Sequence, residues 1–362
     1  MLQADPSRDD IPSLQKAVQS DPRPVTWYHL ARAFAASGDY EAELDSLNTA
    51  LAKDAYFLPA LLAKGKALLN LGREAESVKL YRSFLSAIPK DDGFPAPIRA
   101  QLAEAREVVR LDEERRLQAY AETVERIALD FPGSDLSRAS AYAEQRAGRR
   151  KVYTQQPTAG HFPYLPALEF FDRNLFPWLE QLERQTAAIR DELLAVWDEA
   201  DPNFKPYVRF EAGAPLNQWA ELNHSARWSA WFLWENGVRN DETCARCPAT
   251  AAAAEALPLL DIPGKGPTVM FSVLKPKTRI PPHTGSTNAR TTVHLPLVVP
   301  EGCGFRVGSQ TRQWVEGEAW AFDDTIEHEA WNDSDQPRTI LIVDAWNPLL
   351  TEAERAVVRA VG

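Results

Sequence analysis

The 362-residue sequence contains only three cysteines, and it carries no excess of positive charge. Three cysteines cannot form a disulfide framework, and Cys244 and Cys247 make one CxxC without the second pair that a zinc site of this kind needs. We interpret them as reduced thiols in a loop or helix start, with a redox or metal role as the alternative. Lysine and arginine number 40 against 51 aspartates and glutamates, a formal net charge of −11. Because phosphate binding needs a basic surface, we expect no nucleic acid as the main partner.

Long apolar runs are also missing from the sequence. No stretch of 18 apolar residues occurs, so we predict no membrane span. The first 14 residues lack the basic, apolar pattern of a signal peptide, which makes a cytoplasmic location the default expectation. Hydrophobic residues make up 44% of the sequence, enough for a sizeable core, and the length favours two domains.

The N-terminal part contains an internal repeat. Gly38 in ASGDYEAELDSLNTAL and Gly72 in NLGREAESVKLYRSFL lie 34 positions apart, with apolar positions aligned around them. A 34-residue helix–turn–helix period resembles the tetratricopeptide repeat, which normally needs three or more units. We expect residues 97–131, with apolar positions at helical intervals, to supply the third unit. PGSD at 132–135 should stop that helix, and another should begin after it. The pattern predicts an α-helical tetratricopeptide-like repeat domain over residues 1–150, which offers a surface to a protein partner.

The composition changes near Lys151, where we place the domain boundary. Residues 153–178 are rich in proline and aromatic residues, as in an extended segment that covers a core. Residues 175–197 predict one amphipathic helix. Residues 228–234 have bulky groups at successive positions, which predicts a strand buried on both faces. We assign their tryptophans to core packing, with a role in shaping a peptide groove as the alternative.

Three of the six histidines fall in the segment from Phe271 to Trp346, which reads as strands and turns: His283, His294 and His328. In ARTTVHLPLVV, strand alternation puts Arg290, Thr292 and His294 on one face, opposite an apolar face. Histidines on neighbouring strands can converge if the strands curl into a barrel. Imidazole and oxygen donors with open positions suit Fe(II), Mn(II) or Zn(II).

The carboxylate of the common iron triad is missing from this segment. In that triad the acid lies two residues after the first histidine, and here this position is Gly285. Asp323 and Asp324 could reach the metal as an unusual third ligand, but we favour turn and capping roles for both, because they follow a strand. Spacing alone therefore leaves the metal site open.

The motifs of this segment, taken together, closely resemble one known family. They are HTGSTNAR, HLPL, RQWVEG and FDDTIEHEAW. The resemblance is to the aspartyl/asparaginyl β-hydroxylase family of Fe(II)/2-oxoglutarate-dependent oxygenases, and it runs from about Tyr153 to Trp346. Members of that family also carry glycine at the position of the acid. The resemblance implies a double-stranded β-helix (jelly-roll, cupin-like) domain over residues 151–362, and hence an α+β multidomain protein.

The resemblance also implies roles for individual residues. His283 and His328 match the iron ligands of the family. Three positions match those that hold 2-oxoglutarate: Ser272, His294 and Arg338. Arg290 matches an arginine of the co-substrate and substrate region, whereas Thr292 stands where the animal enzymes have a second arginine.

The implied reaction uses Fe(II), 2-oxoglutarate and O₂ to hydroxylate the β-carbon of an Asp or Asn residue in a peptide or protein. One alternative is an oxygenase of the same fold that acts on a lipid acyl chain or a small molecule, which product analysis would distinguish. Another is a repeat scaffold with a vestigial barrel. The intact His283, His328 and Arg338 weigh against the scaffold.

Overall fold

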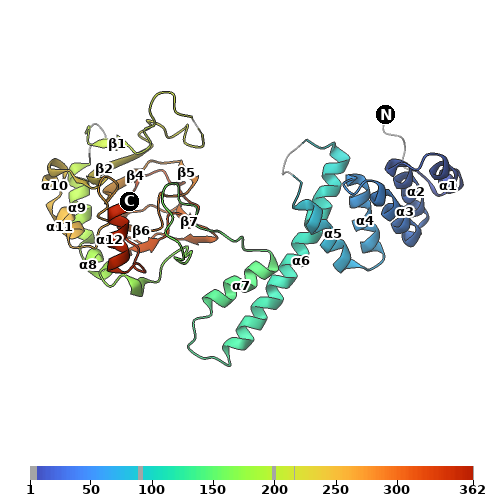
Figure 1. Cartoon of the computed structure of the whole chain (residues 1–362), viewed down its shortest axis with the longest axis horizontal. Coiled ribbons are helices and arrows are strands. Elements are labelled where there is room, and N and C mark those ends of the chain that lie inside the picture. Colours follow the sequence, from blue (N-terminus) through green and yellow to red (C-terminus); the bar gives the residue numbers. More distant parts are fainter. Residues whose placement is uncertain (1–5, 89–92, 198–200, 216, 362) are drawn as a thin grey trace. The chain divides into compact units, whose positions relative to one another are not determined.

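The computed structural model describes residues 6–88, 93–197, 201–215 and 217–361. The chain divides into two compact units, Met1–Arg150 and Lys151–Gly362. The described part of the first unit is helical, and the second unit contains all the strands found in the described residues (Figure 1). The predicted α+β class with an N-terminal helical region is confirmed.

The first unit is built from consecutive helices that pack on one another. Its elements are η1 (Arg8–Asp10), α1 (Ile11–Ser20), α2 (Pro24–Ser37), α3 (Tyr40–Lys53), α4 (Leu58–Asn70), α5 (Glu74–Leu85), α6 (Ala96–Ala128) and α7 (Ser137–Ala147). Gly38, at φ +79°, ends α2, and the Asp39 side chain accepts a hydrogen bond from the Ala42 N–H to start α3. The pairs α2–α3 and α4–α5 repeat this helix–turn–helix pattern.

The helix predicted within residues 97–131 is confirmed as α6, which runs without a break for 33 residues. It supplies one helix of a third pair, and the predicted stop at residues 132–135 separates it from the next helix. After Pro97 this helix contains neither glycine nor proline, so nothing in its sequence interrupts the backbone hydrogen bonds. The turn comes only after Ala128, and α7 is the partner of α6. No helix in the described part of the chain is both long and apolar enough to cross a membrane.

The second unit contains two antiparallel sheets. Its strands are β1 (Phe204–Pro206), β2 (Trp228–Glu235), β3 (Val238–Arg239), β4 (Val269–Leu274), β5 (Thr278–His283), β6 (Arg290–Val298), β7 (Cys303–Val307), β8 (Gln310–Arg312), β9 (Trp320–Phe322), β10 (His328–Asn332) and β11 (Arg338–Trp346). The large sheet has the order β1-β2-β4-β11-β6-β9, with β3 also paired to β2, and the small sheet has the order β5-β10-β7-β8. Because the chain passes back and forth between the sheets from β4 to β11, the unit is a double-stranded β-helix, as predicted.

Helices cover the outer face of the large sheet: α8 (Leu179–Glu183), α9 (Thr186–Val196), α10 (Asp241–Arg246) and α11 (Pro248–Glu255), with the short η2 (Arg173–Leu175) before α8. The last helix, α12 (Glu352–Val361), packs against Trp346 at the end of β11. Ile189 and Leu193 of α9 share a buried core with Trp231 of β2 and Leu341 of β11. The single amphipathic helix predicted over residues 175–197 is wrong, since the segment forms two helices with a break between Glu183 and Thr186.

The two cysteines of the CxxC belong to this core. Cys244 and Cys247 are buried free thiols at α10 and at the start of α11. Burial raises the pKa of Cys247 to about 12 and also raises the pKa of Cys244. A thiol that stays protonated is a poor nucleophile and a poor metal ligand, which agrees with the structural interpretation.

We expect Gly65→Ala to destabilise the helical unit, although alanine is the better helix former. A Cβ at residue 65 would lie 2.0 Å from Cε1 of the buried Tyr81 ring, whose hydroxyl donates to the Leu62 carbonyl oxygen. Overpacking of this kind costs about 1–3 kcal/mol. Thermal unfolding of the full chain, followed by circular dichroism, should therefore show a lower midpoint. Lys66→Ala, at an exposed neighbour, is the control, and equal midpoints for the two variants would contradict the packing of Tyr81 on α4.

Candidate active site

A cavity of 390 Å³ in the second unit lies against the inner faces of both sheets. All six site residues predicted from the sequence line it: Ser272, His283, Arg290, His294, His328 and Arg338. Strand alternation places them there. On β6, Val293, Leu295 and Leu297 pack in the outer core. The alternate residues Arg290, Thr292 and His294 line the cavity. The face assignment made from ARTTVHLPLVV is therefore confirmed.

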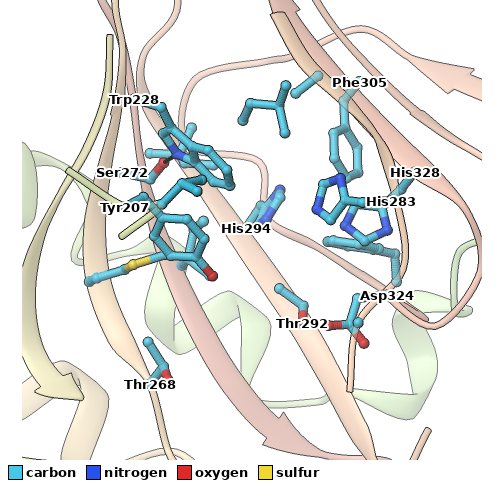
Figure 2. A pocket seen from close by; sticks show the side chains of 18 of the residues that line it. Tyr207, Trp228, Thr268, Ser272, His283, Thr292, His294, Phe305, Asp324 and His328 are labelled. Carbon is cyan, nitrogen blue, oxygen red and sulfur yellow. Dashed lines mark hydrogen bonds between the residues drawn. The ribbon is translucent and has the colours of Figure 1, made fainter. Parts of the chain in front are cut away.

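His283 and His328 form a cross-strand pair. They are directly opposite each other in the antiparallel pairing of β5 with β10, and their ring centroids are 4.1 Å apart. Figure 2 shows the two imidazoles side by side at the cavity wall. Nδ1 of His283 lies 2.8 Å from the Pro281 carbonyl oxygen, and Nδ1 of His328 lies 3.0 Å from that of Ile326. Because a carbonyl oxygen only accepts, each Nδ1 carries the hydrogen and each Nε2 keeps its lone pair.

Both imidazoles are neutral at neutral pH. Burial, followed by the neighbouring His328, lowers the pKa of His283 to about 3. Burial likewise lowers the pKa of His328 to about 4. Protons therefore do not compete for the two Nε2 atoms, which can serve as ligands for a divalent metal. Within the described ranges, no group of three or more His, Cys, Asp or Glu side chains is arranged to hold a metal, so the donor set at this place is the histidine pair.

The position that usually supplies the carboxylate, Gly285, has no room for a side chain. A Cβ at residue 285 would lie 2.0 Å from Oδ2 of Asp324. Gly285 does not have the positive φ that some other glycines of the chain adopt. Glycine is therefore required here for space rather than for backbone freedom, because the Asp324 carboxylate fills the region beside the turn.

The two adjacent aspartates after β9 have different tasks. Asp323 accepts hydrogen bonds from the N–H and the hydroxyl of Thr325, at 3.0 and 2.6 Å, and this is the turn role that the sequence favoured. Asp324 instead pairs with Arg290 through Oδ2, while its buried Oδ1 has no partner in the described structure. Only Asp324 belongs to the cavity wall.

Arg338 is the buried cation of the cavity. The residue is 2% exposed, and its Nε and Nη1 have no hydrogen-bond partner among the described residues. Burial lowers the pKa of Arg338 to about 10, so the guanidinium stays charged at neutral pH. It lies 5.4 Å from the centre of the Trp314 ring. A buried charge without a counterion is unfavourable, which marks this place as a site for an anion.

Ser272 and His294 provide further polar groups on the same sheet face. The Trp228 Nε1–H donates to Ser272 Oγ at 3.1 Å, so the serine hydroxyl keeps its own hydrogen for another acceptor. His294 stacks on Trp314, and its Nδ1 lacks a partner in the described structure. Burial, followed by the charge of Arg338, lowers the pKa of His294 well below its ordinary value. This imidazole is therefore neutral.

Arg290 uses its terminal nitrogens for carboxylates of the chain, whereas its buried Nε has no partner in the described structure. Its Nη2 pairs with Asp324 and its Nη1 lies 3.3 Å from Oδ2 of Asp344. Asp344 also accepts the N–H of Thr268 at 3.1 Å. Arg290 therefore lies in the cavity, as predicted, but its terminal nitrogens bind carboxylates of the chain itself.

The sequence reasoning missed several residues of the cavity wall. Core packing is the expectation for Trp228, with a groove role as the alternative, and for Trp314; both pack in a buried cluster and also line the cavity. Tyr207 and Asp344 line it too but received no role. The signal for Asp344 was present, because it shares the inward-facing parity of Arg338 in the strand RTILIVDAW. No comparable signal existed for Tyr207, which stacks on Trp228 from the segment after β1.

We expect Gly285→Asp to destabilise the second unit, because its side chain and Asp324 would compete for one space. Overpacking should cost about 1–3 kcal/mol, and the like charges add to the cost. Calorimetric unfolding of the full chain should show a lower midpoint. The double variant Gly285→Asp/Asp324→Gly removes the competing side chain and should recover part of the loss. A single variant as stable as the parent would mean that the space beside residue 285 is open.

Comparison with known proteins adds a family assignment. Residues 183–348 match the family model described as aspartyl/asparaginyl beta-hydroxylase. A human protein named aspartyl/asparaginyl beta-hydroxylase is 31% identical over 318 residues, 82% of this chain and 39% of that protein. The ornithine lipid ester-linked acyl 2-hydroxylase of Rhizobium tropici is 35% identical over 188 residues, 51% of this chain and 62% of that protein. The chain thus spans less than two thirds of either relative.

Among solved structures, a predicted oxalate decarboxylase from Thermotoga maritima is 12% identical, and the match covers 33% of this chain and 81% of that one. Its TM-score of 0.23 is too low to support an argument. The motifs, the matched model and the relatives agree with one another. Through residues 183–348, the chain belongs to the aspartyl/asparaginyl β-hydroxylase family.

Proposed function

We propose that this protein is an Fe(II)- and 2-oxoglutarate-dependent oxygenase that hydroxylates the β-carbon of an Asp or Asn residue in a peptide or protein. The observation that carries the proposal is the buried, unpaired guanidinium of Arg338 in the same cavity as two neutral histidines with free Nε2 atoms. A dicarboxylate that also ligates a metal satisfies both features at once. The names of the human and mouse relatives support Asp or Asn as the target.

The cavity residues fit these two groups. His283 and His328 would hold Fe(II) through Nε2, since their Nδ1 atoms are already committed. Arg338 would bind the distal carboxylate of 2-oxoglutarate, because a guanidinium pairs bidentately with a carboxylate. Ser272 would donate its hydroxyl hydrogen to the same co-substrate. His294, neutral and adjacent to Trp314, would complete the polar wall around it.

The chain's own task is to bind, orient and exclude water. When bound, Fe(II) supplies the redox chemistry by which one atom of O₂ enters the substrate C–H bond, the other enters succinate, and CO₂ leaves. Phe305, Trp314 and Trp228 surround the polar groups with aromatic surface. In such a dry pocket each charge pair is stronger than in water, and reactive species are protected from solvent.

A second candidate is hydroxylation of a lipid acyl chain. Its support is the Rhizobium relative and an apolar patch in the large sheet: Ala230, Phe232, Met270 and Ile342. Met270 and Ile342 line the cavity, so an acyl chain would find apolar contacts there. Mass spectrometry of the products from peptide and acyl substrates separates this candidate from the first.

The helical unit, in our proposal, recruits a protein partner or substrate. Its repeated helix pairs expose polar outer positions and bury alanines and leucines between helices, as stacked repeats do. The cavity residues described above all belong to the second unit. Recruitment and chemistry would then lie on separate parts of the chain.

Replacing either histidine of the pair should strongly weaken metal binding. With only two protein ligands, losing one removes half of the donor set. We expect titration of the full chain with Fe(II) under nitrogen, and with Mn(II) as a stable substitute, to show one site in the parent. His283→Ala and His328→Ala should lose it, whereas His161→Ala, at an exposed histidine outside the cavity, should keep it. Parent-like affinity in both cavity variants would refute the assignment.

Replacing Arg338 should weaken 2-oxoglutarate binding without lowering the stability of the folded protein. Loss of a bidentate charged pair costs about 2–5 kcal/mol, so Arg338→Met should weaken 2-oxoglutarate binding tens- to thousands-fold. The same change removes an uncompensated buried charge, so the ligand-free variant should be at least as stable as the parent. Calorimetry measures both quantities. Arg279→Met, at an exposed arginine paired with Asp333, is the control and should leave 2-oxoglutarate affinity unchanged; undiminished affinity in Arg338→Met would place the co-substrate elsewhere.

A further inference from the structure

The cavity holds a second set of charged side chains, away from Arg338, which we name the ion triad: Arg290, Asp324 and Asp344. Asp344 and Arg338 lie six residues apart on β11, which corresponds to about 20 Å along a strand. Asp344 is opposite Thr292 on β6, whereas Arg338 is opposite Leu274 on β4. The ion triad is therefore distinct from the place where 2-oxoglutarate is proposed to bind, and it faces the part of the cavity left for the substrate.

The ion triad carries a net negative charge. Arg290 contributes one positive charge, and its two terminal nitrogens are occupied by the two carboxylates. The side chains are 17, 7 and 4% exposed for Arg290, Asp324 and Asp344, so water does little to screen them. Burial raises the pKa of Asp344, and the charge of Arg290 opposes that rise. With both carboxylates ionised the ion triad has one net negative charge, and it keeps a buried acceptor, Asp324 Oδ1, and a buried donor, Arg290 Nε, without partners in the described structure.

No other cation at this end is free to balance that charge. The described cavity lining contains three arginines and no lysine: Arg209, Arg290 and Arg338. Arg209 pairs with Glu235 at 2.5 Å and lies over the Phe232 ring. Arg338 lies at the opposite end of β11. Thr292, the β6 residue paired with Asp344, adds a hydroxyl to the cavity wall but no charge.

We infer that this site selects an uncharged reacting side chain, so that the enzyme hydroxylates asparagine in preference to aspartate. The inference rests on the proposed function, and it specifies the substrate class of the same site. The charges of Fe(II), the 2-oxoglutarate dianion, Arg338 and the ion triad sum to zero, so a neutral substrate side chain leaves the loaded cavity neutral, whereas a substrate carboxylate adds an uncompensated negative charge. A substrate carboxylate would meet a negative charge in a dry cavity, whereas the amide of asparagine is neutral and offers N–H groups to Asp324 Oδ1.

The direct test uses a peptide library with a central Asn or Asp and randomised flanks. The full chain, Fe(II), 2-oxoglutarate and O₂ are added, and hydroxylated products are counted by mass spectrometry. We expect at least tenfold more product from the Asn half. Equal product from both halves, or more from Asp, overturns the inference while leaving the proposed function intact. If no peptide is hydroxylated although Fe(II) and 2-oxoglutarate bind, the proposed peptide hydroxylation fails, and the inference fails with it.

A charge variant tests whether the ion triad is the cause. Asp344→Asn makes the triad neutral and releases one terminal nitrogen of Arg290. We expect the ratio of Asp to Asn product to rise about tenfold. Asp333→Asn removes a carboxylate from an exposed pair outside the cavity and should leave the ratio unchanged. An unchanged ratio in a folded Asp344→Asn variant overturns the assignment of selectivity to the triad.

Binding without turnover gives an independent readout. The full chain with Zn(II) and 2-oxoglutarate is titrated with an Asn peptide chosen from the library and with its Asp counterpart. We expect the Asn peptide to bind at least tenfold more tightly, and the preference to shrink in 0.5 M salt, because screening weakens repulsion. Equal affinity of the two peptides at low salt overturns the inference even if Asp344→Asn fails to fold.

Discussion

A charge that is buried on the inner face of the large sheet needs a counterion, because removing it from water is costly. The chain meets this requirement in two ways. For Arg290 it supplies two carboxylates, Asp324 and Asp344, and so fixes β6, β11 and the turn after β9 against one another. For Arg338 it supplies none among the described residues. A guanidinium that is 2% exposed and unpaired stores unfavourable free energy that a bound carboxylate would release. A carboxylate bound at Arg338 would therefore stabilise the folded protein.

The histidine pair depends on local geometry in the same way on both strands. Each Nδ1 contacts the carbonyl oxygen two residues earlier in its own chain segment, Pro281 for His283 and Ile326 for His328. The tautomer of each imidazole is therefore set within its own strand, and the pairing of β5 with β10 needs only to bring the rings together. No side chain at residue 285 is needed to orient the two imidazoles. The space beside Gly285 is therefore open to the Asp324 carboxylate, which pairs with Arg290.

The sequence predicted the parts of this arrangement that are local. Alternation in ARTTVHLPLVV correctly separated the cavity face of β6 from its core face, and the motifs brought together six residues that line one cavity. The sequence did not predict the features that depend on contacts between residues far apart in the chain. No periodicity shows that Trp228, in a strand of bulky residues, lines the cavity and donates to Ser272 on the neighbouring strand β4. The pairing of Arg290 with carboxylates 34 and 54 residues away, and the lack of any for Arg338, are equally invisible to local pattern. In the helical unit, the stop at PGSD correctly separated two helices, but the 34-residue repeat period does not show that α6 alone is 33 residues long.

Strand β11 places two opposite charges on the inner face of the large sheet. Its inward-facing positions are Arg338, Ile340, Ile342 and Asp344: a cation, two aliphatic side chains and an anion. Apolar surface separates the two charges, so neither can neutralise the other. Because the chain fixes both charges on one strand between two neighbours, β4 and β6, the two ends cannot be moved together without breaking the large sheet. In the proposed function the co-substrate binds the cation end and the substrate meets the anion end. Under that proposal, changes of substrate are expected at the anion end, whereas Arg338 and the histidine pair are constrained by the co-substrate and the metal that they would hold.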